Sequence, residues 1–460
     1  MPKPNVILIL ADDMGYGDFS AFNPAIDSTP AIDDLVANGT TLSSCYASSP
    51  VCAPARASIM TGRYPQRCGV IDTLETRGYD RLRIDETTMA DIFSKNGYTT
   101  GLIGKWHLGA IAPEYHPNAR GFDYFMGFRG GWNDYYDYHI ERNGERLQCD
   151  GKYLTDVFSD EAVHFVRKNK DRPFFLHLAY NAPHFPIQAP ADIVEKYRRA
   201  GAETDAVCRL RAMIEIMDEG IGRILRELDD CRLTDDTIVI FSSDNGPDFG
   251  GTGDECLKRY NCILRGEKML AYEGGIKVPA VMRWPHHVDS GKVSNELVHG
   301  TDWLPTLISF CGLPLERELE FDGIDATAAF TGGQLAERRL YWQWNRHQPN
   351  LGSNAAARDG NWKLVHAPIR EYLDLPAHEI DMDVEIKYKP ELYAKLVEEP
   401  IDPRPEIVVP IVELYDLSKD GEEKANIACV ETARVQAMES QLRKWFAEVE
   451  RDRIRPLNTR

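Results

Sequence analysis

The sequence lacks three features that would each point to a particular class of protein. It has no run of about 18 apolar residues, the length that a helix needs to cross a bilayer. Its 53 Lys and Arg are outnumbered by 72 Asp and Glu, and the net charge of -19 argues against a nucleic-acid or anionic-membrane binder. It also has no internal repeat and no low-complexity tract. An ordinary soluble globular protein remains, and the 43% hydrophobic content agrees with that class.

Cysteine is present, but it follows no metal-binding pattern. The ten cysteines are scattered along the chain without a Cys-x-x-Cys pair or a regular spacing. This argues against zinc-finger ligation and favours free thiols in a reducing compartment. The apolar run at residues 6–11 is too short for the core of a signal peptide, so we interpret it as a first strand and expect a cytoplasmic protein.

Short β-prone apolar runs alternate with helical patterns along the chain. The runs are NVILILADD, TTGLIGKWH, PFFLHLAYNAPH and TIVIFSSDNG, and the clearest helical patterns are 29–38, 88–96, 154–168 and 207–229. This alternation predicts an α/β fold whose large domain has a mostly parallel, mixed central sheet flanked by helices.

The chain of 460 residues is longer than one hydrophobic core usually serves. We therefore expect a large domain at 1–335 and a small C-terminal α+β subdomain at 336–460, with an antiparallel sheet and a final helix near 431–449. The charged, proline-dotted stretch at 369–410 is expected to be an inserted loop region, for which the sequence suggests no role.

Two pairs of oxygen-bearing side chains stand at the ends of apolar runs. Asp12 and Asp13 end the first run, and Asp244 and Asn245 end the run that begins at Thr237. If the two strands are neighbours, these side chains converge outside the carboxyl ends of a parallel sheet. Either pair alone also fits ordinary turn chemistry. Both pairs together favour a hard divalent cation, Ca²⁺ or Mg²⁺.

Four basic side chains are further candidates for the same site. Lys105 and His107 are two residues apart in an extended segment, so they share a face. His184 lies in NAPHFP and Lys268 in LRGEKM. Each alone could be a surface or capping residue. Together they could bind an anionic substrate and supply a general acid and a general base.

The stretch SSPVCAPARASIMTGRYP, residues 48–65, places Cys52 just before a predicted helix that ends at Gly62. Pro54 suits the first turn of a helix, and Arg56 lies one turn along the face of Cys52. The helix N-terminus favours negative charge, which predicts a lowered pKa for this thiol. From these residues alone, Cys52 could be a core residue, a thiolate nucleophile, a metal ligand or the precursor of another group.

CAPAR followed by ASIMTGRYP resembles the signature of the type I sulfatases, C-x-P-x-R with a downstream T-G-R. Other blocks resemble the same family in the family's order, and they are NVILILADDMGYGD, GLIGKWHLG, NAPHFP, FSSDNG, LRGEKMLAYEGGIKVP, RDGNWKLV and ELYDLSKDGEEKANIA. The resemblance covers nearly the whole chain. It implies an alkaline-phosphatase-like fold and the hydrolysis of sulfate esters.

The resemblance also implies a modification of Cys52. In this family the cysteine is oxidised to Cα-formylglycine, which requires a formylglycine-generating enzyme or an anaerobic sulfatase-maturating enzyme as a partner. The anaerobic, bacterial route would suit a cytoplasmic protein. The modified residue would join a divalent ion, usually Ca²⁺ with Mg²⁺ as the alternative, whose other ligands would be Asp12, Asp13, Asp244 and Asn245.

The same resemblance implies a catalytic role for several of the matching residues. One hydroxyl of the hydrated aldehyde attacks sulfur, and the second is then deprotonated to expel sulfate, with His107 as the base. Lys105, Lys268, His184 and the metal surround the sulfate oxygens, and His184 or Lys268 protonates the leaving alcohol. Arg56 steadies the diol.

Substrate recognition is less determined by these blocks. GFRGGWNDYYDYHI resembles a segment of sulfatases that act on N-acetylgalactosamine sulfates, so Trp132, Asn133, Asp134 and Tyr136 could line a sugar subsite, although a loop of structural aromatics fits equally well. Near the C-terminal subdomain, YWQWNRH adds three candidates, Trp342, Trp344 and His347. We prefer a small sulfated carbohydrate such as a glycosaminoglycan unit, with aryl sulfates also cleaved.

Two alternatives to a sulfatase stay open. One is a phosphate monoester or phosphonate hydrolase of the same superfamily, although the sequence offers no convincing second set of metal ligands. The other is a non-catalytic sulfate-binding protein, against which the intact set of acidic and basic candidates argues.

Overall fold

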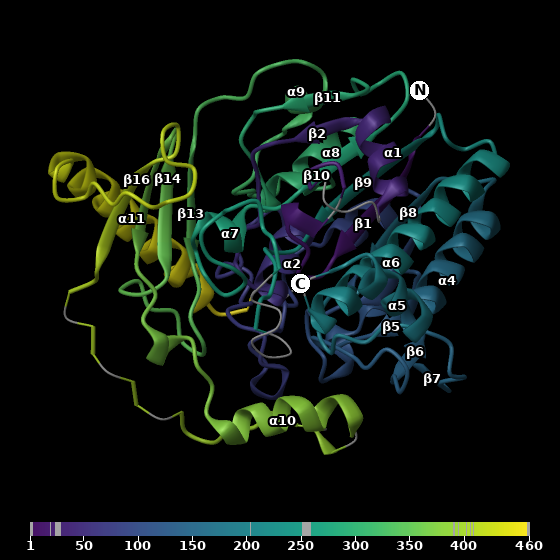
Figure 1. Cartoon of the computed structure of the whole chain (residues 1–460), viewed down its shortest axis with the longest axis horizontal. Coiled ribbons are helices and arrows are strands. Elements are labelled where there is room, and N and C mark those ends of the chain that lie inside the picture. Colours follow the sequence, from purple (N-terminus) through teal and green to yellow (C-terminus); the bar gives the residue numbers. More distant parts are fainter. Residues whose placement is uncertain are drawn as a thin grey trace.

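A computed structural model describes residues 3–18, 20–23, 29–202, 204–250, 259–389, 392–393, 395–401, 403–404, 406–407 and 409–457. Figure 1 shows a large sheet wrapped by helices, a small sheet beside it with the last helix, and one isolated helix below both. None of the helices in the described ranges is long and apolar enough to cross a membrane.

The large sheet is built around strand β1 (Asn5–Ala11), whose seven residues are all buried. It has ten strands in the order β11-β2-β10-β9-β1-β8-β4-β5-β6-β7. β1 pairs in parallel with β8 (Phe174–Ala179) and β9 (Thr237–Ser243), and β8 with β4 (Thr99–Lys105). The other strands are β2 (Thr40–Leu42), β5 (Tyr124–Phe128), β6 (Ile140–Arg142), β7 (Glu145–Leu147), β10 (Ala280–Arg283) and β11 (Lys292–Ser294). Antiparallel pairs such as β10 with β9 make the sheet mixed, as predicted.

Alternate residues of β1 enter two hydrophobic cores, one on each face of the sheet. Ile7 and Ile9 pack with α1 (Pro30–Asn38), α4 (Leu154–Asn169) and α6 (Asp205–Asp230). Leu8 and Leu10 pack with α2 (Cys52–Thr61), α3 (Met89–Lys95) and α8 (Trp303–Cys311). A strand buried on both faces needs apolar side chains at every position, which explains the continuous run in the sequence. The α/β fold and the four predicted helices are confirmed.

The described chain also contains shorter elements. They are β3 (Cys45–Tyr46) paired with β12 (Val298–His299), the helices α5 (Ala191–Arg199), α7 (Glu273–Ile276) and α9 (Thr327–Phe330), and the 3₁₀ turns η1 (Tyr16–Asp18), η2 (Glu75–Arg77), η3 (Pro113–Tyr115), η4 (Pro117–Arg120), η6 (Gly300–Asp302) and η7 (Arg370–Tyr372).

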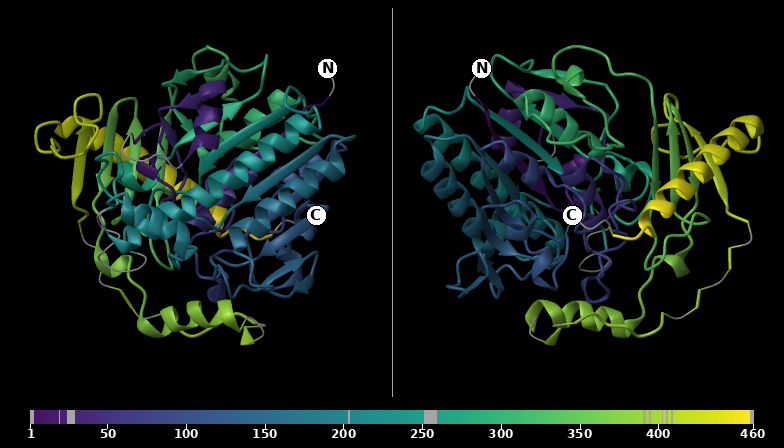
Figure 2. Two further views of the ribbon diagram at one scale, coloured as in Figure 1. Left: turned by 45° about the vertical axis from the view of Figure 1, so that its right-hand side comes forward. Right: turned by 180° about the vertical axis from the view of Figure 1, so that it is seen from behind.

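The C-terminal part has its own antiparallel sheet, as expected. Its order is β13 (Arg339–Gln343), β14 (Ala355–Asp359), β15 (Trp362–His366) and β16 (Val412–Asp416). Helix α11 (Thr432–Arg453) covers this sheet through buried residues that include Leu442 and Trp445, and Figure 2 shows it crossing the strands. The domain boundary at 335/336 stays a prediction.

The expectation of a loop region at 369–410 was wrong, because it contains helix α10 (Ala377–Tyr388). In all views α10 lies apart from the C-terminal sheet, across one end of the large domain. Two of its three buried residues are charged: Glu379 receives a hydrogen bond from Arg77 Nε at 2.8 Å, and Lys387 pairs with Glu75. The face that α10 buries is mostly charged, so no apolar pattern in the sequence marks that face.

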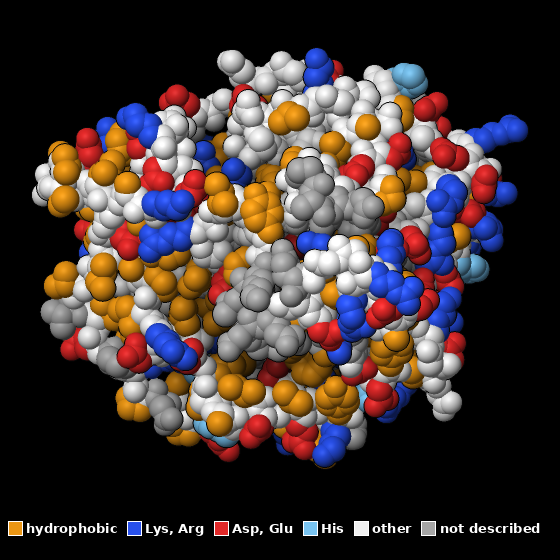
Figure 3. All heavy atoms as spheres, viewed as in Figure 1, with side chains coloured by type: hydrophobic (Ala, Val, Ile, Leu, Met, Phe, Trp, Pro, Cys, Tyr) orange, Lys and Arg blue, Asp and Glu red, His pale blue; other side chains and the backbone are white. Residues whose placement is uncertain are grey.

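One face of the molecule is mixed in charge. Acidic and basic side chains are interspersed on the face shown in Figure 3, and hydrophobic side chains gather along its lower edge, where α10 lies. The exposed hydrophobic residues of α10 are Ile380, Val384 and Tyr388, four residues apart.

Candidate active site

The acidic candidates converge at the carboxyl ends of neighbouring strands. Ala11 at the end of β1 lies opposite Ser243 at the end of β9. Asp12 and Asp13 therefore emerge beside Asp244 and Asn245, and all four are fully buried. A main-chain hydrogen bond links the two pairs, because Asp13 N–H donates to Asp244 Oδ1 at 3.2 Å.

Each of the three carboxylates has a cationic partner. Lys105, the last residue of β4, donates from Nζ to Asp12 Oδ2 at 2.6 Å. Lys268 donates to Asp13 Oδ2 at 2.7 Å. Arg56 Nε donates to Asp244 Oδ2 at 2.9 Å. The three ion pairs hold the carboxylates close together in a buried environment. These residues are therefore grouped as expected, and Arg56 binds a carboxylate of the group.

The residues present fit a hard divalent cation. Asp12 Oδ1 and Asn245 Oδ1 are buried without a hydrogen-bond partner among the described residues. Asn245 Nδ2 is already used, because it donates to Asp13 Oδ1 at 2.7 Å. Burial and the neighbouring Asp244 raise the pKa of Asp12 to about 8 although Lys105 and Arg56 act to lower it, so ionising this carboxyl is costly without a further cation. Free oxygens among crowded carboxylates suit Ca²⁺ or Mg²⁺.

Cys52 is the first residue of α2, and all ten residues of this helix are buried. The helix ends at Gly62, whose φ of 70° places it in the left-handed region that glycine adopts freely. Cys52 Sγ and carboxylate oxygens of Asp12 and Asp244 all lie within 4.8 Å of one another. The predicted lowering of the thiol pKa was wrong: burial raises the pKa of Cys52, and it outweighs the attraction of Lys105 and Lys268.

Two histidines face this centre, and burial lowers the pKa of both well below the usual value. His184 Nδ1 lies 2.8 Å from Phe185 O, and its Nε2 lies 3.7 Å from Asp13 Oδ2. His107 Nε2 lies 3.1 Å from Thr73 O, while its Nδ1 is buried without a partner among the described residues. Because a carbonyl only accepts, His107 carries its proton on Nε2 and keeps Nδ1 as a free acceptor.

A cavity of about 160 Å³ opens onto the centre. Its lining includes Cys52, His107, His184 and Lys268. Of the residues expected to read a sugar, it contains only Trp132.

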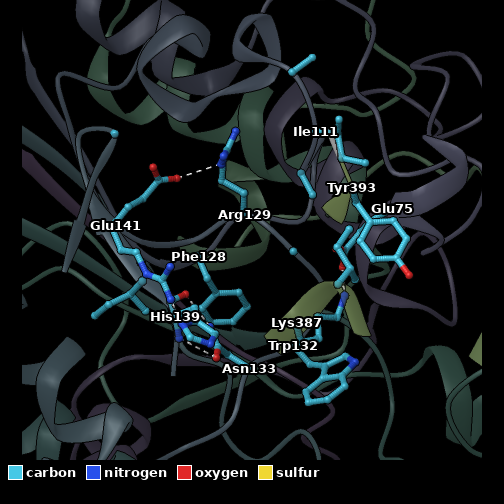
Figure 4. Close-up of a pocket in the computed structure, with 18 residues that line it drawn as sticks. Glu75, Ile111, Phe128, Arg129, Trp132, Asn133, His139, Glu141, Lys387 and Tyr393 are labelled. Carbon is cyan, nitrogen blue, oxygen red and sulfur yellow. Dashed lines mark hydrogen bonds and ion pairs between the residues drawn. The ribbon is translucent and has the colours of Figure 1, made fainter. Parts of the chain in front are cut away.

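The other expected sugar-reading residues lie elsewhere. Asn133 lines a neighbouring cavity of about 360 Å³, which Trp132 also lines, and both are labelled in Figure 4. Asp134 accepts hydrogen bonds from the main-chain N–H of Tyr136 and of Asp137, and Tyr136 is 39% exposed. The remaining three are buried: Trp342 donates to Ala47 O, Trp344 packs with Val51 and Leu373, and His347 pairs with Glu379.

Sequence reasoning missed several residues of the cavity wall. Arg346, Asp248 and Asp383 line it together with the active-site side chains. Asp248 follows the DNG turn and Arg346 lies in YWQWNRH, so proximity to these blocks could have suggested both. Asp383 lies on α10, and no pattern in the sequence marks it.

Comparison with known proteins decides the family. A family model described as Sulfatase matches residues 4–313, more than half of the chain. The chain belongs to the sulfatase family. A second model, described as N-sulphoglucosamine sulphohydrolase, C-terminal, matches residues 266–391. The predicted family and enzyme class, a sulfuric ester hydrolase, are confirmed.

Relatives of this sulfatase carry sulfatase names. The chain is 32% identical over 372 residues to N-acetylgalactosamine-6-sulfatase of Canis lupus familiaris, covering 74% of this chain and 68% of that protein. It is 32% identical over 374 residues to the uncharacterized sulfatase YdeN of Escherichia coli, covering 70% of this chain and 65% of that protein. The chain thus spans about two thirds of the length of these relatives. The crystal structure of Ps i-CgsB in complex with k-i-k-neocarrahexaose superposes with a TM-score of 0.80 at 30% identity, covering 99% of this chain and 95% of that one.

Proposed function

We propose that this sulfatase hydrolyses sulfate esters of small carbohydrates through Cys52 converted to Cα-formylglycine. The observation that carries the proposal is the position of Cys52. Its sulfur atom lies within 4.8 Å of carboxylate oxygens of Asp12 and Asp244, in a buried centre that also holds Lys105 and Lys268. The raised pKa of the thiol argues against an unmodified thiolate as the nucleophile.

The mechanism implied by the resemblance to type I sulfatases needs a hydrated aldehyde at residue 52. It would supply one hydroxyl to attack sulfur as the sulfur–oxygen bond to the alcohol breaks. Deprotonation of its second hydroxyl would then break the carbon–oxygen bond to the sulfate, release sulfate and restore the aldehyde. The oxidation of Cys52 requires a maturation partner, either a formylglycine-generating enzyme or an anaerobic sulfatase-maturating enzyme.

A divalent ion, Ca²⁺ or Mg²⁺, would be held by Asp12, Asp13, Asp244, Asn245 and residue 52. When bound, it supplies positive charge to the sulfate oxygens. Lys105 and Lys268 supply positive charge from the protein side.

Proton transfers fall to three side chains of the cavity wall. Burial opposes the charge of Lys268, but Asp13 raises its pKa above the usual value, so Nζ stays protonated and can donate to the leaving alcohol. His184 is neutral and holds its ring proton on Nδ1, 2.8 Å from Phe185 O, so it can share this role only after its Nε2 has gained a proton. His107 is neutral with a free Nδ1, which suits the base that deprotonates the second hydroxyl.

The names of the relatives support a carbohydrate substrate, and Trp132 adds an aromatic side chain to the lining of the cavity. Aryl sulfates are expected to be cleaved as well, because their leaving groups need less protonation.

Mass spectrometry of the peptide containing Cys52, isolated from the native host, tests the proposal. We expect the mass of formylglycine at residue 52 together with turnover of an aryl sulfate. Active protein that carries only unmodified cysteine would overturn the mechanism. Parallel assays on a phosphate monoester and a phosphonate monoester would show whether sulfate is the preferred group.

A further inference from the structure

The cavity beside Cys52 is lined by two charged side chains to which no role has been assigned. Arg346 follows strand β13, and Asp383 belongs to α10. Both line the same cavity as Cys52. Its volume of about 160 Å³ is smaller than the several hundred Å³ of typical ligand pockets, so it suits one sugar ring beside the sulfate. Arg346 and Asp383 are therefore placed to contact the ring that carries the scissile bond.

Arg346 is held in place and keeps hydrogen-bond donors free. Its Nη1 donates to Asp72 Oδ1 at 3.0 Å and to Thr73 Oγ1 at 2.7 Å, and its guanidinium lies 5.1 Å from the ring centre of Trp344. Its Nε is too deeply buried to meet a ligand, but among the described residues Nη2 makes no hydrogen bond, and the side chain is 15% exposed. A fixed guanidinium with an unused N–H is a preorganised donor for a ligand oxygen.

Two neighbouring side chains hold Asp383 in place. Its Oδ2 accepts a hydrogen bond from Trp132 Nε1 at 3.0 Å, and its Oδ1 lies 3.5 Å from Lys387 Nζ. Lys387 in turn pairs with Glu75, and Figure 4 shows Lys387, Glu75 and Trp132 together on one side of the neighbouring cavity. The carboxylate of Asp383 is 28% exposed, so it retains acceptor capacity towards the cavity.

The charges of this outer wall do not favour a second anion. The wall carries two carboxylates, Asp248 and Asp383, and two cations, Arg346 and Lys268. The charge of Arg346 is already offset by Asp72, which is fully buried. Lys268 is bound to Asp13 and lies 3.9 Å from Asp248. Asp383 lies 3.5 Å from Lys387. A carboxylate or second sulfate on the ring would therefore find no surplus of positive charge. Hydroxyl groups, in contrast, both donate and accept, and they match a wall with fixed acceptors and a fixed donor.

We infer that Asp383 and Arg346 select an uncharged, hydroxyl-bearing pyranose ring beside the scissile sulfate, with Asp383 accepting from and Arg346 donating to its hydroxyl groups. This inference rests on the proposed sulfatase activity. It names the class of substrate as neutral sugars that carry the cleaved sulfate as their single charged group.

A panel of monosulfated pyranosides tests the inference. It contains neutral rings and the matching uronates, sulfated at each shared hydroxyl position, together with one aryl sulfate. We expect the neutral member to be cleaved at least tenfold faster in kcat/KM than its uronate. A uronate as the fastest substrate would overturn the inference.

Variants of the two side chains give an independent measurement. Asp383→Asn and Arg346→Gln are each expected to lower the ratio of sugar-sulfate to aryl-sulfate kcat/KM at least tenfold. Asp381→Asn, on the exposed side of α10, and Arg370→Gln, which is 88% exposed, are matched controls that should keep the ratio. A ratio within threefold of the wild type in both Asp383→Asn and Arg346→Gln would refute the assignment.

The aryl sulfate separates failure of the inference from failure of the proposed function. Cleavage of the aryl sulfate without cleavage of any sugar sulfate would overturn the inference and leave sulfatase chemistry intact. Loss of all sulfate turnover in formylglycine-containing protein would overturn both.

Discussion

Lys105 Nζ lies 2.6 Å from Oδ2 of Asp12, and neither side chain has any exposure to solvent. A buried ion pair of this kind gives little net stability, yet removing one partner leaves a charge without compensation. The pair therefore ties the integrity of the acidic centre to a residue on a different strand.

Lys105→Met is expected to lower the free energy of unfolding by about 3–5 kcal/mol, because Asp12 loses its closest cation. Urea unfolding of the metal-free protein measures this change. Lys424→Met is the control, since Lys424 is 74% exposed. Equal stability of the two variants would contradict a structural role for the Lys105–Asp12 pair.

Cys52→Ala is expected to reduce aryl sulfate turnover by more than about a thousandfold, because the nucleophile is absent. The fold should survive, since α2 keeps its remaining apolar contacts. Circular dichroism and kcat report the two effects separately. Substantial turnover in this variant would remove Cys52 from the mechanism.

Chelation is expected to lower both activity and melting temperature, and Ca²⁺ should restore both. The acidic cluster is destabilised without a cation, and a ligand present at 100 times its Kd stabilises the folded state by about 2.7 kcal/mol. Thermal unfolding with and without Ca²⁺ gives a readout that does not depend on turnover. The variant Asn245→Ala should reduce the calcium-induced shift, and an unchanged shift would exclude Asn245 as a ligand.

Gly131→Ala is expected to reduce kcat at least tenfold, because its Cβ would lie 2.7 Å from Cε1 of His107 and displace the ring. Gly421→Ala serves as the control, since its nearest atom would lie at 3.8 Å. Steady-state assays on an aryl sulfate compare the two variants. If Gly131→Ala kept wild-type kcat, the exact placement of His107 would not matter for the reaction.

Stability is expected to fall as the pH drops below about 6.5, partly because of His177. Burial lowers the pKa of His177 to about 3. Between these two pH values the unfolded chain binds a proton at His177 and the folded chain does not. The contribution of His177 to the free energy of unfolding is therefore complete above pH 6.5 and is lost progressively towards pH 3.

His177→Gln should make this decline shallower, by at most about 1.4 kcal/mol per pH unit. Urea unfolding between pH 4 and pH 7.5 measures the slope, and His164→Gln, on an exposed part of α4, is the control. A slope as steep as that of the wild type would show that His177 does not contribute to it.

Much of the active site was predictable because strand ends in a parallel sheet meet at one edge. Asp12 and Asp244 each follow an apolar run, so the fold class alone brings them together. The substrate wall could not be predicted in this way. Asp383 reaches the cavity through α10, whose docking depends on ion pairs with Glu75 and Arg77, about 300 residues earlier. The pKa of Cys52 was misjudged because the sequence indicates a helix end but does not show how deeply that end is buried.

The reacting groups come from strand ends inside the large domain, whereas Asp383 stands on a helix attached by long connections and a few ion pairs. Substitutions on that helix can accumulate without disturbing the sheet or the metal ligands. On the inferred role of Asp383, replacing residues of α10 is a direct way to redirect the sugar specificity while Asp12 and Asp244 stay in place.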